Sequence, residues 1–307
     1  MDSVFAAVGQ VLFIMLFAPI LSGVIKKIKA LLQNRQGPRV LQPYYDLQKY
    51  LNKDMVISEH ASWLFHVTPY AVLGCMLSAG LFIPAALMKA PLSAYGDLFL
   101  VVYLFVAARF FMVVASLDTA SAFAGMGGSR EMAISALVEP VLLLSLLTVS
   151  LFAQSTNLST IVSNGIAVGW SGISIAHIFA LLAFIIVTLA ETGRIPVDNP
   201  DTHLELTMVH EGMLLEYSGK YLAMLQWAAS IKQLLVFSLL ANLFFAGVLN
   251  VSELSPLAAA LCYIAKLLFI GFGVAMIEIS TSKMRLFRVP ELLGASFILS
   301  VLAIISL

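Results

Sequence analysis

The residues best suited to chemistry lie in one polar segment, residues 191–219, which reads ETGRIPVDNPDTHLELTMVHEGMLLEYSG. It carries six carboxylates and a single arginine, Arg194, between apolar runs long enough to cross a bilayer. The carboxylates are Glu191, Asp198, Asp201, Glu205, Glu211 and Glu216. Charges this close to hydrocarbon are costly, so they usually face a partner protein, a hydrated cavity or a proton route. The sequence therefore predicts that this polar segment carries most of the function.

Short helices are expected within the polar segment. Asp198-Asn199-Pro200 is typical of a helix start, with a capping side chain followed by proline in the first turn. A helix from Asp201 would place four polar side chains on one face: His203, Thr207, His210 and Glu211. A second start is predicted near residues 216–219. The two histidines are seven residues apart, two helical turns, which is too far for one metal ion, so no metal site is assigned.

Charged residues within the apolar runs form a second group of candidates. Glu139 lies about two turns into an apolar run, and a lone carboxylate there is a functional candidate by default. The structural alternative is an ion pair with Arg109 or Arg130. Arg109 and Lys266 are the other charges inside apolar runs, and either could partner Glu139 or Glu278. Glu278, near the end of its run, is interpreted as an interfacial residue.

The composition indicates a membrane protein. Of 307 residues, 61% are hydrophobic and 11% are charged, whereas a soluble domain has roughly 25% charged residues. The formal net charge is zero, which gives no general attraction to nucleic acid. Because a spanning helix needs about 20 apolar residues, we predict an all-α polytopic membrane protein, a single integral membrane domain over 1–307. The eight predicted spans lie near residues 4–25, 64–88, 97–116, 132–154, 172–190, 231–250, 256–280 and 290–306.

The distribution of basic residues predicts the orientation. Fourteen of the 17 lysines and arginines fall in odd-numbered loops. They are Lys26, Lys27, Lys29, Arg35, Arg39, Lys49, Lys53, Arg130, Arg194, Lys220, Lys232, Lys283, Arg285 and Arg288. Since positive loops stay in the cytoplasm, the odd-numbered loops, with the acidic loop 191–230, are expected on the cytoplasmic side.

Two loops have features of their own. In the first loop, apolar residues recur at helical spacing over about 40–53 against polar ones, which predicts an amphipathic helix at the membrane surface. An ordinary connector is the alternative. In the third loop, Gly127-Gly128 is expected to interrupt the helix between the third and fourth spans.

The sequence lacks the usual signatures of redox or nucleophilic chemistry. It has no glycine-rich phosphate loop, no cluster of four cysteines and no nucleophile paired with a base. The two cysteines, Cys75 and Cys262, lie in separate apolar runs and are interpreted as small packing residues. Any redox centre is therefore expected on another subunit.

Four motifs together resemble a known family. They are NRQGPRVLQ with the following YDLQK (residues 34–49), LDT through GGSRE with Glu139-Pro140 (residues 117–140), residues 191–198, and residues 205–219. The chain resembles the subunit 1 (H subunit) family of respiratory complex I over nearly its whole length. Within it the likeness is to the hydrogenase branch, formate hydrogenlyase subunit 4 and hydrogenase-4 component C of the group 4 membrane-bound nickel–iron hydrogenases.

The resemblance implies a membrane subunit of an oxidoreductase complex with no catalytic cofactor on this chain. The nickel–iron centre and iron–sulfur clusters would sit on partners: hydrogenase-like large and small subunits and iron–sulfur proteins, with antiporter-like subunits in the membrane. The implied docking residues for the peripheral arm are Asn34, Arg35, Gly37, Pro38, Arg39 and Arg130. The implied proton relay is Glu139, Glu191, Asp198, Asp201, Glu205, Glu211 and Glu216.

Other functions remain open on the sequence. One alternative is the quinone-binding subunit of an NADH–quinone oxidoreductase-like complex, although the motif continues RVLQ and the acidic loop reads THLELTMVHEG. Another is an independent proton-coupled transporter, which the lack of a repeated pair of broken helices argues against. A third is a pure anchor whose acids only cap helices and meet basic partner surfaces.

Overall fold

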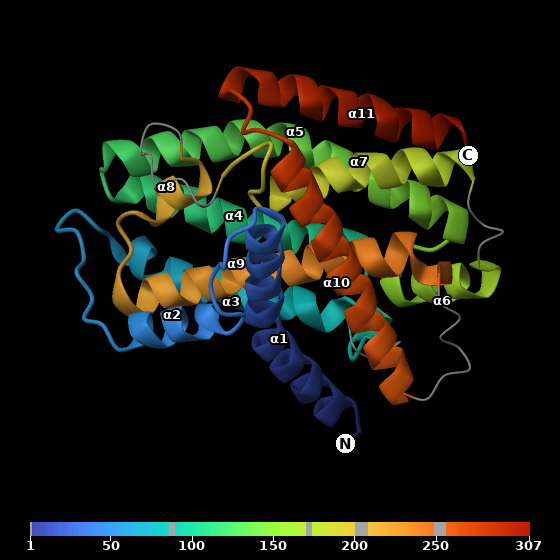
Figure 1. Cartoon of the computed structure of the whole chain (residues 1–307), viewed down its shortest axis with the longest axis horizontal. Helices are drawn as coiled ribbons and strands as arrows, with labels where there is room; N and C mark the ends of the chain where they lie inside the picture. Colours follow the sequence, from blue (N-terminus) through green and yellow to red (C-terminus); the bar gives the residue numbers. More distant parts are fainter. Residues whose placement is uncertain (1, 86–89, 170–173, 200–207, 249–255) are drawn as a thin grey trace.

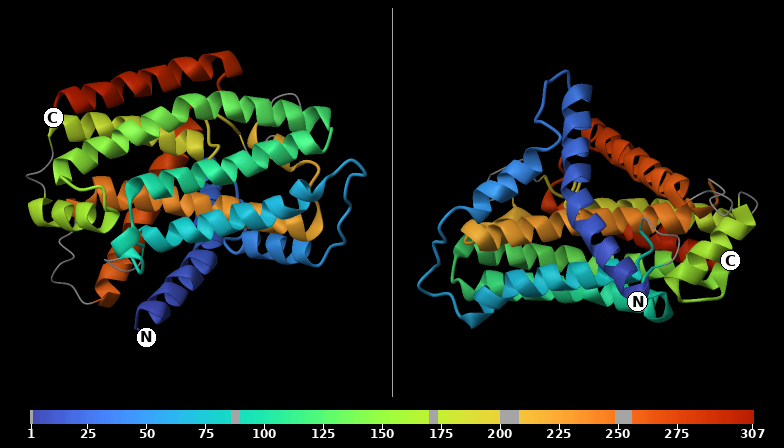
Figure 2. Two further views of the ribbon diagram at one scale, coloured as in Figure 1. Left: turned by 180° about the vertical axis from the view of Figure 1, so that it is seen from behind. Right: turned by 90° about the horizontal axis from the view of Figure 1, so that it is seen from below.

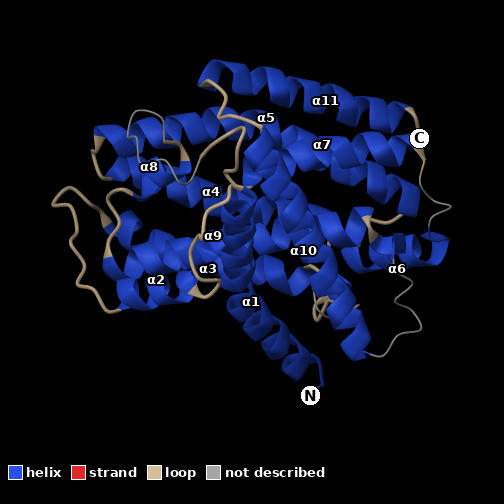
Figure 3. Ribbon diagram, in the orientation of Figure 1, coloured by secondary structure: helices blue, strands red, loops and turns tan. Residues whose placement is uncertain are grey.

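The computed structural model describes residues 2–85, 90–169, 174–199, 208–248 and 256–307. Within these ranges the chain consists of helices joined by loops, with no named strand (Figure 3). The predicted all-α architecture is therefore confirmed. The longer helices are α1 (Asp2–Leu32), α3 (Trp63–Phe82), α4 (Leu98–Asp118), α5 (Ala122–Ala153), α7 (Ile175–Glu191), α9 (Gly219–Leu239), α10 (Pro256–Ser280) and α11 (Val289–Ile305). The shorter ones are α2 (Gln42–Leu51), α6 (Leu158–Val168) and α8 (His210–Leu214).

Seven helices of the described chain are long and apolar enough to cross a bilayer. They correspond to seven of the eight predicted spans, and the remaining prediction, residues 172–190, corresponds to α7, whose 17 residues are just short of that length. The spans predicted from the sequence and the long apolar helices of the structure therefore agree. The chain is a multi-pass membrane protein.

The start of the sixth predicted span was wrong. We expected it at residue 231, with Lys220 and Lys232 in the preceding loop, but α9 begins at Gly219 and contains both lysines. The polar residues of its first half lowered the apparent hydropathy, although several of them face protein. The predicted helix start near residues 216–219 is correct.

The helices form a layered bundle (Figure 1). α11, α7, α5, α4 and α3 pack successively against one another, and α9 lies against α3 and α1. α1 and α10 run steeply across the others and contact each other (Figures 1 and 2). In the most apolar part of α9, 72% of the residues are buried, against 28% in α1 and in α11. α9 is therefore central, and α1 and α11 are left with large outward-facing apolar surfaces.

Gly127-Gly128 does not interrupt a helix, contrary to the sequence prediction. α5 runs unbroken from Ala122 through both glycines to Ala153. A Cβ on Gly127 would lie 2.9 Å from the Val209 carbonyl oxygen, and one on Gly128 would overlap Ser116 Oγ. The absence of side chains lets α4 and the segment before α8 approach α5 closely, and this packing outweighs the low helix propensity of glycine.

The first loop is held against the bundle at both ends. α2 occupies the position of the predicted amphipathic helix, and only its Leu47 is fully buried. Tyr44 donates a hydrogen bond to the Leu16 carbonyl of α1, and burial raises the pKa of its phenol. Further along, Ser218 Oγ exchanges hydrogen bonds of 2.8 Å with the backbone of Val56. The first loop and the start of α9 therefore share one end of the molecule.

Candidate functional site

A buried arginine gathers three carboxylates in the middle of the bundle. Arg109 of α4 lies 2.5 Å from Glu191 Oε1 through Nη2, 2.7 Å from Glu139 Oε1 through Nη1, and 3.3 Å from Glu131 Oε1 through Nε. Glu131 and Glu139 lie about two turns apart on α5, and Glu191 is the last residue of α7. We call these residues, with Lys232 of α9, the Arg109 cluster.

Lys232 completes the Arg109 cluster from the opposite side. Its Nζ lies 2.7 Å from Glu191 Oε2, so Glu191 is paired with a different cation at each oxygen. Because Glu191 is almost fully buried, both pairs offset the large cost of removing its charge from water. With every group ionised, the cluster has two positive and three negative charges.

Exposure differs among the three carboxylates. The Glu191 side chain is 2% exposed, Glu131 is 18% exposed and Glu139 is 31% exposed. The carboxylates of the cluster thus range from the buried Glu191 at the end of α7 to the partly exposed Glu139 on α5. Glu139 is therefore the carboxylate of the cluster that other molecules can reach most easily.

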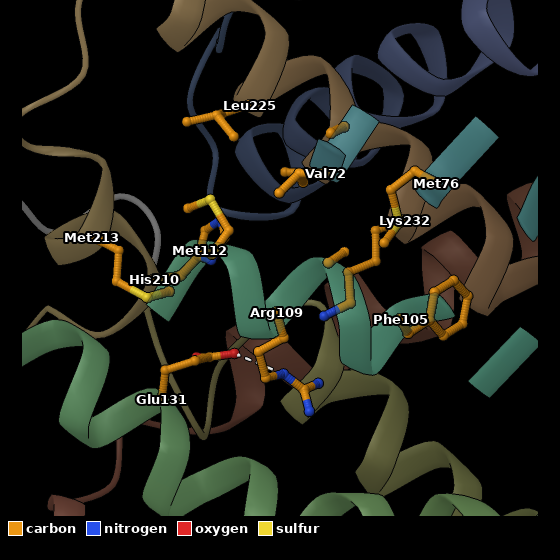
Figure 4. A pocket seen from close by; sticks show the side chains of 13 residues that line it. Val72, Met76, Phe105, Arg109, Met112, Glu131, His210, Met213, Leu225 and Lys232 are labelled. Carbon is orange, nitrogen blue, oxygen red and sulfur yellow. Dashed lines mark ion pairs between the residues drawn. The ribbon is translucent and has the colours of Figure 1, made fainter. Parts of the chain in front are cut away.

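Two pockets meet at the Arg109 cluster. The apolar pocket is lined by Val72, Met76, Phe105 and Met112, with Arg109, Glu131, His210 and Lys232 on its polar side (Figure 4). The acidic pocket is lined by Glu131, Glu191, Thr192, Asp198, His210 and Lys232. Glu131, His210 and Lys232 belong to both, so these side chains form the wall between an apolar hollow and an acidic one.

A second buried cluster lies just beyond the end of α7. Arg194 Nη2 donates to Gln233 Oε1 at 3.0 Å, and its Nη1 lies 3.3 Å from Glu278 Oε1. Lys29 Nζ of α1 lies 3.5 Å from Glu278 Oε2. Lys29, Arg194, Gln233 and Glu278 form what we call the Arg194 cluster. Lys232 and Gln233 are adjacent on α9, so this helix contributes one residue to each cluster.

Asp198 lies between the polar segment and the loop after α10. Its Oδ1 accepts from the Asn199 backbone N–H and lies 2.8 Å from Lys283 Nζ, and its Oδ2 accepts from the His210 N–H at 3.4 Å. Asp198 therefore meets the first residue of α8. The helix predicted to start at Asp198-Asn199-Pro200 falls on residues 200–207, which lie outside the described residues, so this capping role stays a prediction.

The predicted relay residues separate into three groups. Glu139 and Glu191 meet at Arg109, and Asp198 joins Glu191 in the acidic pocket. Glu211 and Glu216 are both half-buried, and no ion pair is found for either within the described ranges. Asp201 and Glu205, with His203 and Thr207, lie outside the described residues. The relay assignment as a whole stays a prediction.

All predicted docking residues except Arg130 lie at a third, basic pocket near the end of α1. Lys26, Lys29, Arg35 and Arg39 line it, with Asp46 as the acidic residue. Gly37 turns the chain back at φ +63°, and a Cβ there would overlap the Cβ of Ala30. Only glycine combines this backbone conformation with so close an approach to α1. Asn34 and Pro38 form the same turn.

Arg130 lies apart from the basic pocket. It donates at 3.0 Å to the Met208 carbonyl, which it holds next to α8. It does not pair with Glu139, whose cation is Arg109. Lys266, the other suggested partner of Glu139 or Glu278, instead donates to the Phe245 carbonyl at 2.8 Å.

Sequence reasoning missed several members of the two clusters. Glu278 was interpreted as interfacial, yet its side chain is fully buried between Arg194 and Lys29. Lys232 was placed in a loop, and Glu131 was noticed only within a motif. Glu278 is a lone carboxylate in an otherwise apolar run, and an unpaired carboxylate there would be very costly. This feature could have indicated that Glu278 has cationic partners. The identity of its partners required the fold.

Comparison with known proteins agrees with this architecture. Residues 5–307 match the family described as NADH dehydrogenase. The chain is 36% identical to formate hydrogenlyase subunit 4 of Escherichia coli over 301 residues, covering 97% of this chain and 96% of that one. The chain belongs to the NADH dehydrogenase family. It is also 32% identical to hydrogenase-4 component C of Escherichia coli, covering 97% of this chain and 93% of that one.

More distant members of the NADH dehydrogenase family come from quinone-linked complexes. NADH-quinone oxidoreductase subunit 8 of Rhodothermus marinus is 29% identical over 253 residues, covering 76% of this chain and 71% of that one. Among solved structures, a chain of the archaeal membrane-bound sulfane sulfur reductase has the same fold, with a TM-score of 0.85 and 21% identity, over 99% of this chain and 100% of that one. The resemblance inferred from the four motifs is confirmed, and the chain is a membrane subunit of an oxidoreductase complex.

Proposed function

We propose that this chain is the membrane subunit of a complex I-like hydrogenase of the formate hydrogenlyase type. Two near-full-length relatives support the assignment, since one is a formate hydrogenlyase subunit and the other a hydrogenase-4 component. The proposed partners are hydrogenase-like large and small subunits, iron–sulfur proteins and antiporter-like membrane subunits. The nickel–iron centre and the iron–sulfur clusters belong to those partners, and the complex lies in the cytoplasmic membrane with the odd-numbered loops inside.

The first role of the chain in this proposal is to anchor the peripheral arm. The basic pocket and its turn, residues 34–39, present four cations at one end of the molecule. Contacts between loops brace this region: Met284 N–H donates to the Pro196 carbonyl at 2.9 Å, and Val56 meets Ser218. A surface built from several loops offers one continuous face to a docked subunit.

The second role is to couple redox chemistry to proton or ion movement. The observation that carries this part is Arg109 with its three carboxylates. Arginine does not release its proton in proteins, so it acts as a fixed charge for which the carboxylates compete. When one carboxylate gains a proton, Arg109 attracts the remaining carboxylates more strongly, so their titrations are coupled.

An electron on a nearby partner would act on this cluster through its field. Added negative charge raises the proton affinity of neighbouring carboxylates, and a shift of one pKa unit corresponds to about 1.4 kcal/mol. Glu139, the most exposed of the three, is the proposed point of proton exchange. Asp198 and Glu191 provide the entry from the acidic pocket, and Asp201, Glu205, Glu211 and Glu216 complete the proposed relay.

The test is purification of the complex in mild detergent through a tag on this chain. We expect recovery with a nickel-containing large subunit and iron–sulfur proteins, identified by mass spectrometry and metal analysis. Glu139→Gln should then leave assembly and hydrogen evolution in place while lowering the proton movement into sealed vesicles per hydrogen formed.

A matched control is Glu291→Gln, an exposed carboxylate in the first turn of α11, far from Arg109 in the chain. Recovery with nickel-free partners and bound quinone would replace the hydrogenase assignment with the quinone-linked one. Recovery of this chain alone as an active unit would contradict both. Unchanged coupling in every cluster variant would leave only the anchoring role.

A further inference from the structure

Lys29 belongs to two sites at once. It lines the basic pocket at the end of α1, and its Nζ lies 3.5 Å from the buried Glu278 Oε2. This separation exceeds the roughly 2.7–2.9 Å of a strong charge-assisted hydrogen bond. Glu278 Oε2 has no hydrogen-bond donor among the residues described. The ammonium group is thus shared between a surface pocket and a buried carboxylate, and it holds the carboxylate loosely.

The pocket side of Lys29 favours a negatively charged occupant. Lys26, Arg35 and Arg39 line the pocket with it, and none of these three has an ion pair in the described chain. Four cations face one carboxylate, Asp46, which is already engaged by Gln42 Nε2 at 2.9 Å. Charge complementarity therefore favours a carboxylate-bearing segment of a docked protein.

The buried side of Lys29 leads to the polar segment. Glu278 holds the Arg194 side chain, and the Arg194 backbone forms the turn that follows α7: its N–H donates to Leu189 O at 2.8 Å, and its carbonyl accepts from the N–H groups of Val197 and Asp198 at 2.9 and 3.2 Å. This turn lies between Glu191 and Asp198, the two carboxylates of the acidic pocket that flank it in the chain.

We propose that the Lys29–Glu278–Arg194 chain reports occupancy of the basic pocket to the turn at residues 192–198. A carboxylate of the docked partner draws Lys29 toward the pocket and weakens its attraction for Glu278. Glu278 then binds Arg194 more closely, and the turn that positions Glu191 and Asp198 shifts with it. Lys29, Glu278 and Arg194 are positioning residues in this scheme. The inference rests on the proposed docking role of the first loop.

Demonstrating a route between two sites requires measured coupling, not only intervening contacts. We would follow the turn with Thr192→Cys, in a background with Cys75 and Cys262 replaced by serine. The rate of maleimide labelling would be measured in native membranes with the peripheral subunits present and after their genetic removal. We expect the two rates to differ, and the difference to be lost in Lys29→Met and in Glu278→Gln.

Lys26→Met is the matched control, because Lys26 lines the same pocket and forms no ion pair with Glu278 in the described chain. It should release the peripheral subunits at lower salt while keeping the difference in labelling. A difference that persists in Lys29→Met would overturn the inference, since it would then reflect direct shielding by the partner. Loss of the difference on adding anionic lipid vesicles to arm-free membranes would overturn it too, by assigning the pocket to lipid.

Failure of the underlying docking role gives a separate result. Peripheral subunits retained equally by wild type, Lys26→Met and Lys29→Met across a salt series would show that the arm does not use this pocket. A different result is that Lys26→Met and Lys29→Met weaken retention of the peripheral subunits while Glu278→Gln leaves the labelling difference unchanged. This result would keep the docking role and reject the link through Lys29, Glu278 and Arg194.

Discussion

The two buried clusters differ in charge balance and in the exposure of their carboxylates. The Arg109 cluster has three carboxylates for two cations, and one of them, Glu139, is 31% exposed. The Arg194 cluster has one carboxylate for two cations, and Glu278 is fully sealed. An excess of carboxylates, one of them accessible, suits a cluster to contact with a proton donor, whereas a sealed carboxylate between two cations suits fixed packing of the elements that carry them. The first cluster is therefore suited to proton exchange and the second to holding elements in place.

The clusters are also physically joined. Neighbouring residues of α9, Lys232 and Gln233, contact one cluster each, and the residues after Glu191 lead directly to Arg194. A change in one cluster can therefore reach the other through a single helix and a single turn. The variants below test whether the clusters differ as their exposure and charge balance indicate.

The largest effect is expected from Arg109→Met. Removing the guanidinium leaves three carboxylates without their shared cation, and breaking a buried ion pair from one side costs about 3–5 kcal/mol. The chain should accumulate poorly in membranes, measured by immunoblotting and by thermal stability in detergent. Normal accumulation with normal stability would mean that the cluster is not held by Arg109, and Arg109→Lys gives the charge-retaining control.

A smaller loss of stability is expected from Glu278→Gln. The amide keeps the size and one acceptor but removes the charge that pairs Arg194 and Lys29, and hydrogen bonds to charged groups contribute about 1.5–3 kcal/mol. Thermal unfolding of the purified complex measures the loss. If Lys29→Met and Glu278→Gln together destabilise by the sum of their separate effects, the two residues do not act as a pair.

Glu139→Gln should barely change stability. The Glu139 side of its ion pair with Arg109 is about one-third exposed, and Arg109 keeps Glu131 and Glu191 as partners, so the expected loss is about 1 kcal/mol or less. The expected change is instead in proton movement per hydrogen formed, measured in sealed vesicles. A loss of stability as large as that of Glu278→Gln would remove the contrast between an exchangeable and a fixed cluster.

The smallest effect is expected from Lys283→Met. Lys283 is 25% exposed, and its partner Asp198 keeps two backbone donors, Asn199 and His210. Loss of this pair should cost at most about 1 kcal/mol of stability. Hydrogen exchange over residues 192–199 would detect local loosening, and no loosening elsewhere is expected. Failure to assemble would instead make Asp198 as critical as Glu278.

Several features of the fold and the site were predictable from the sequence. The apolar runs define the spans because each must be long enough to cross hydrocarbon. The helix start near Gly219 and the surface helix near Gln42 follow from local patterns. The pairing of Glu139 with Arg109 was one of three candidate pairings, with Arg130 and Lys266 as the other partners, because a carboxylate within an apolar run needs a cation and few were available.

Other features required contacts between distant segments. Gly127-Gly128 stays helical because its bare surface accepts Ser116 and Val209, which a local reading of glycine as a breaker could not reveal. Lys232 was expected in a loop because it is charged. It lies within α9 because Glu191, at the end of α7, pairs with it. Glu278 gains its significance from Lys29, which comes from the first helix of the chain and lies 3.5 Å away in space.

By itself, the sequence determined that this is a helical membrane protein with an acidic segment, and its motifs pointed to the family. Those conclusions depend on composition, periodicity and short spacings, which are local properties. Only the tertiary structure decided which charges share a cluster and which are buried. The physical reason is that the cost of burying a charge depends on its partners, and here the partners come from helices far apart in the chain.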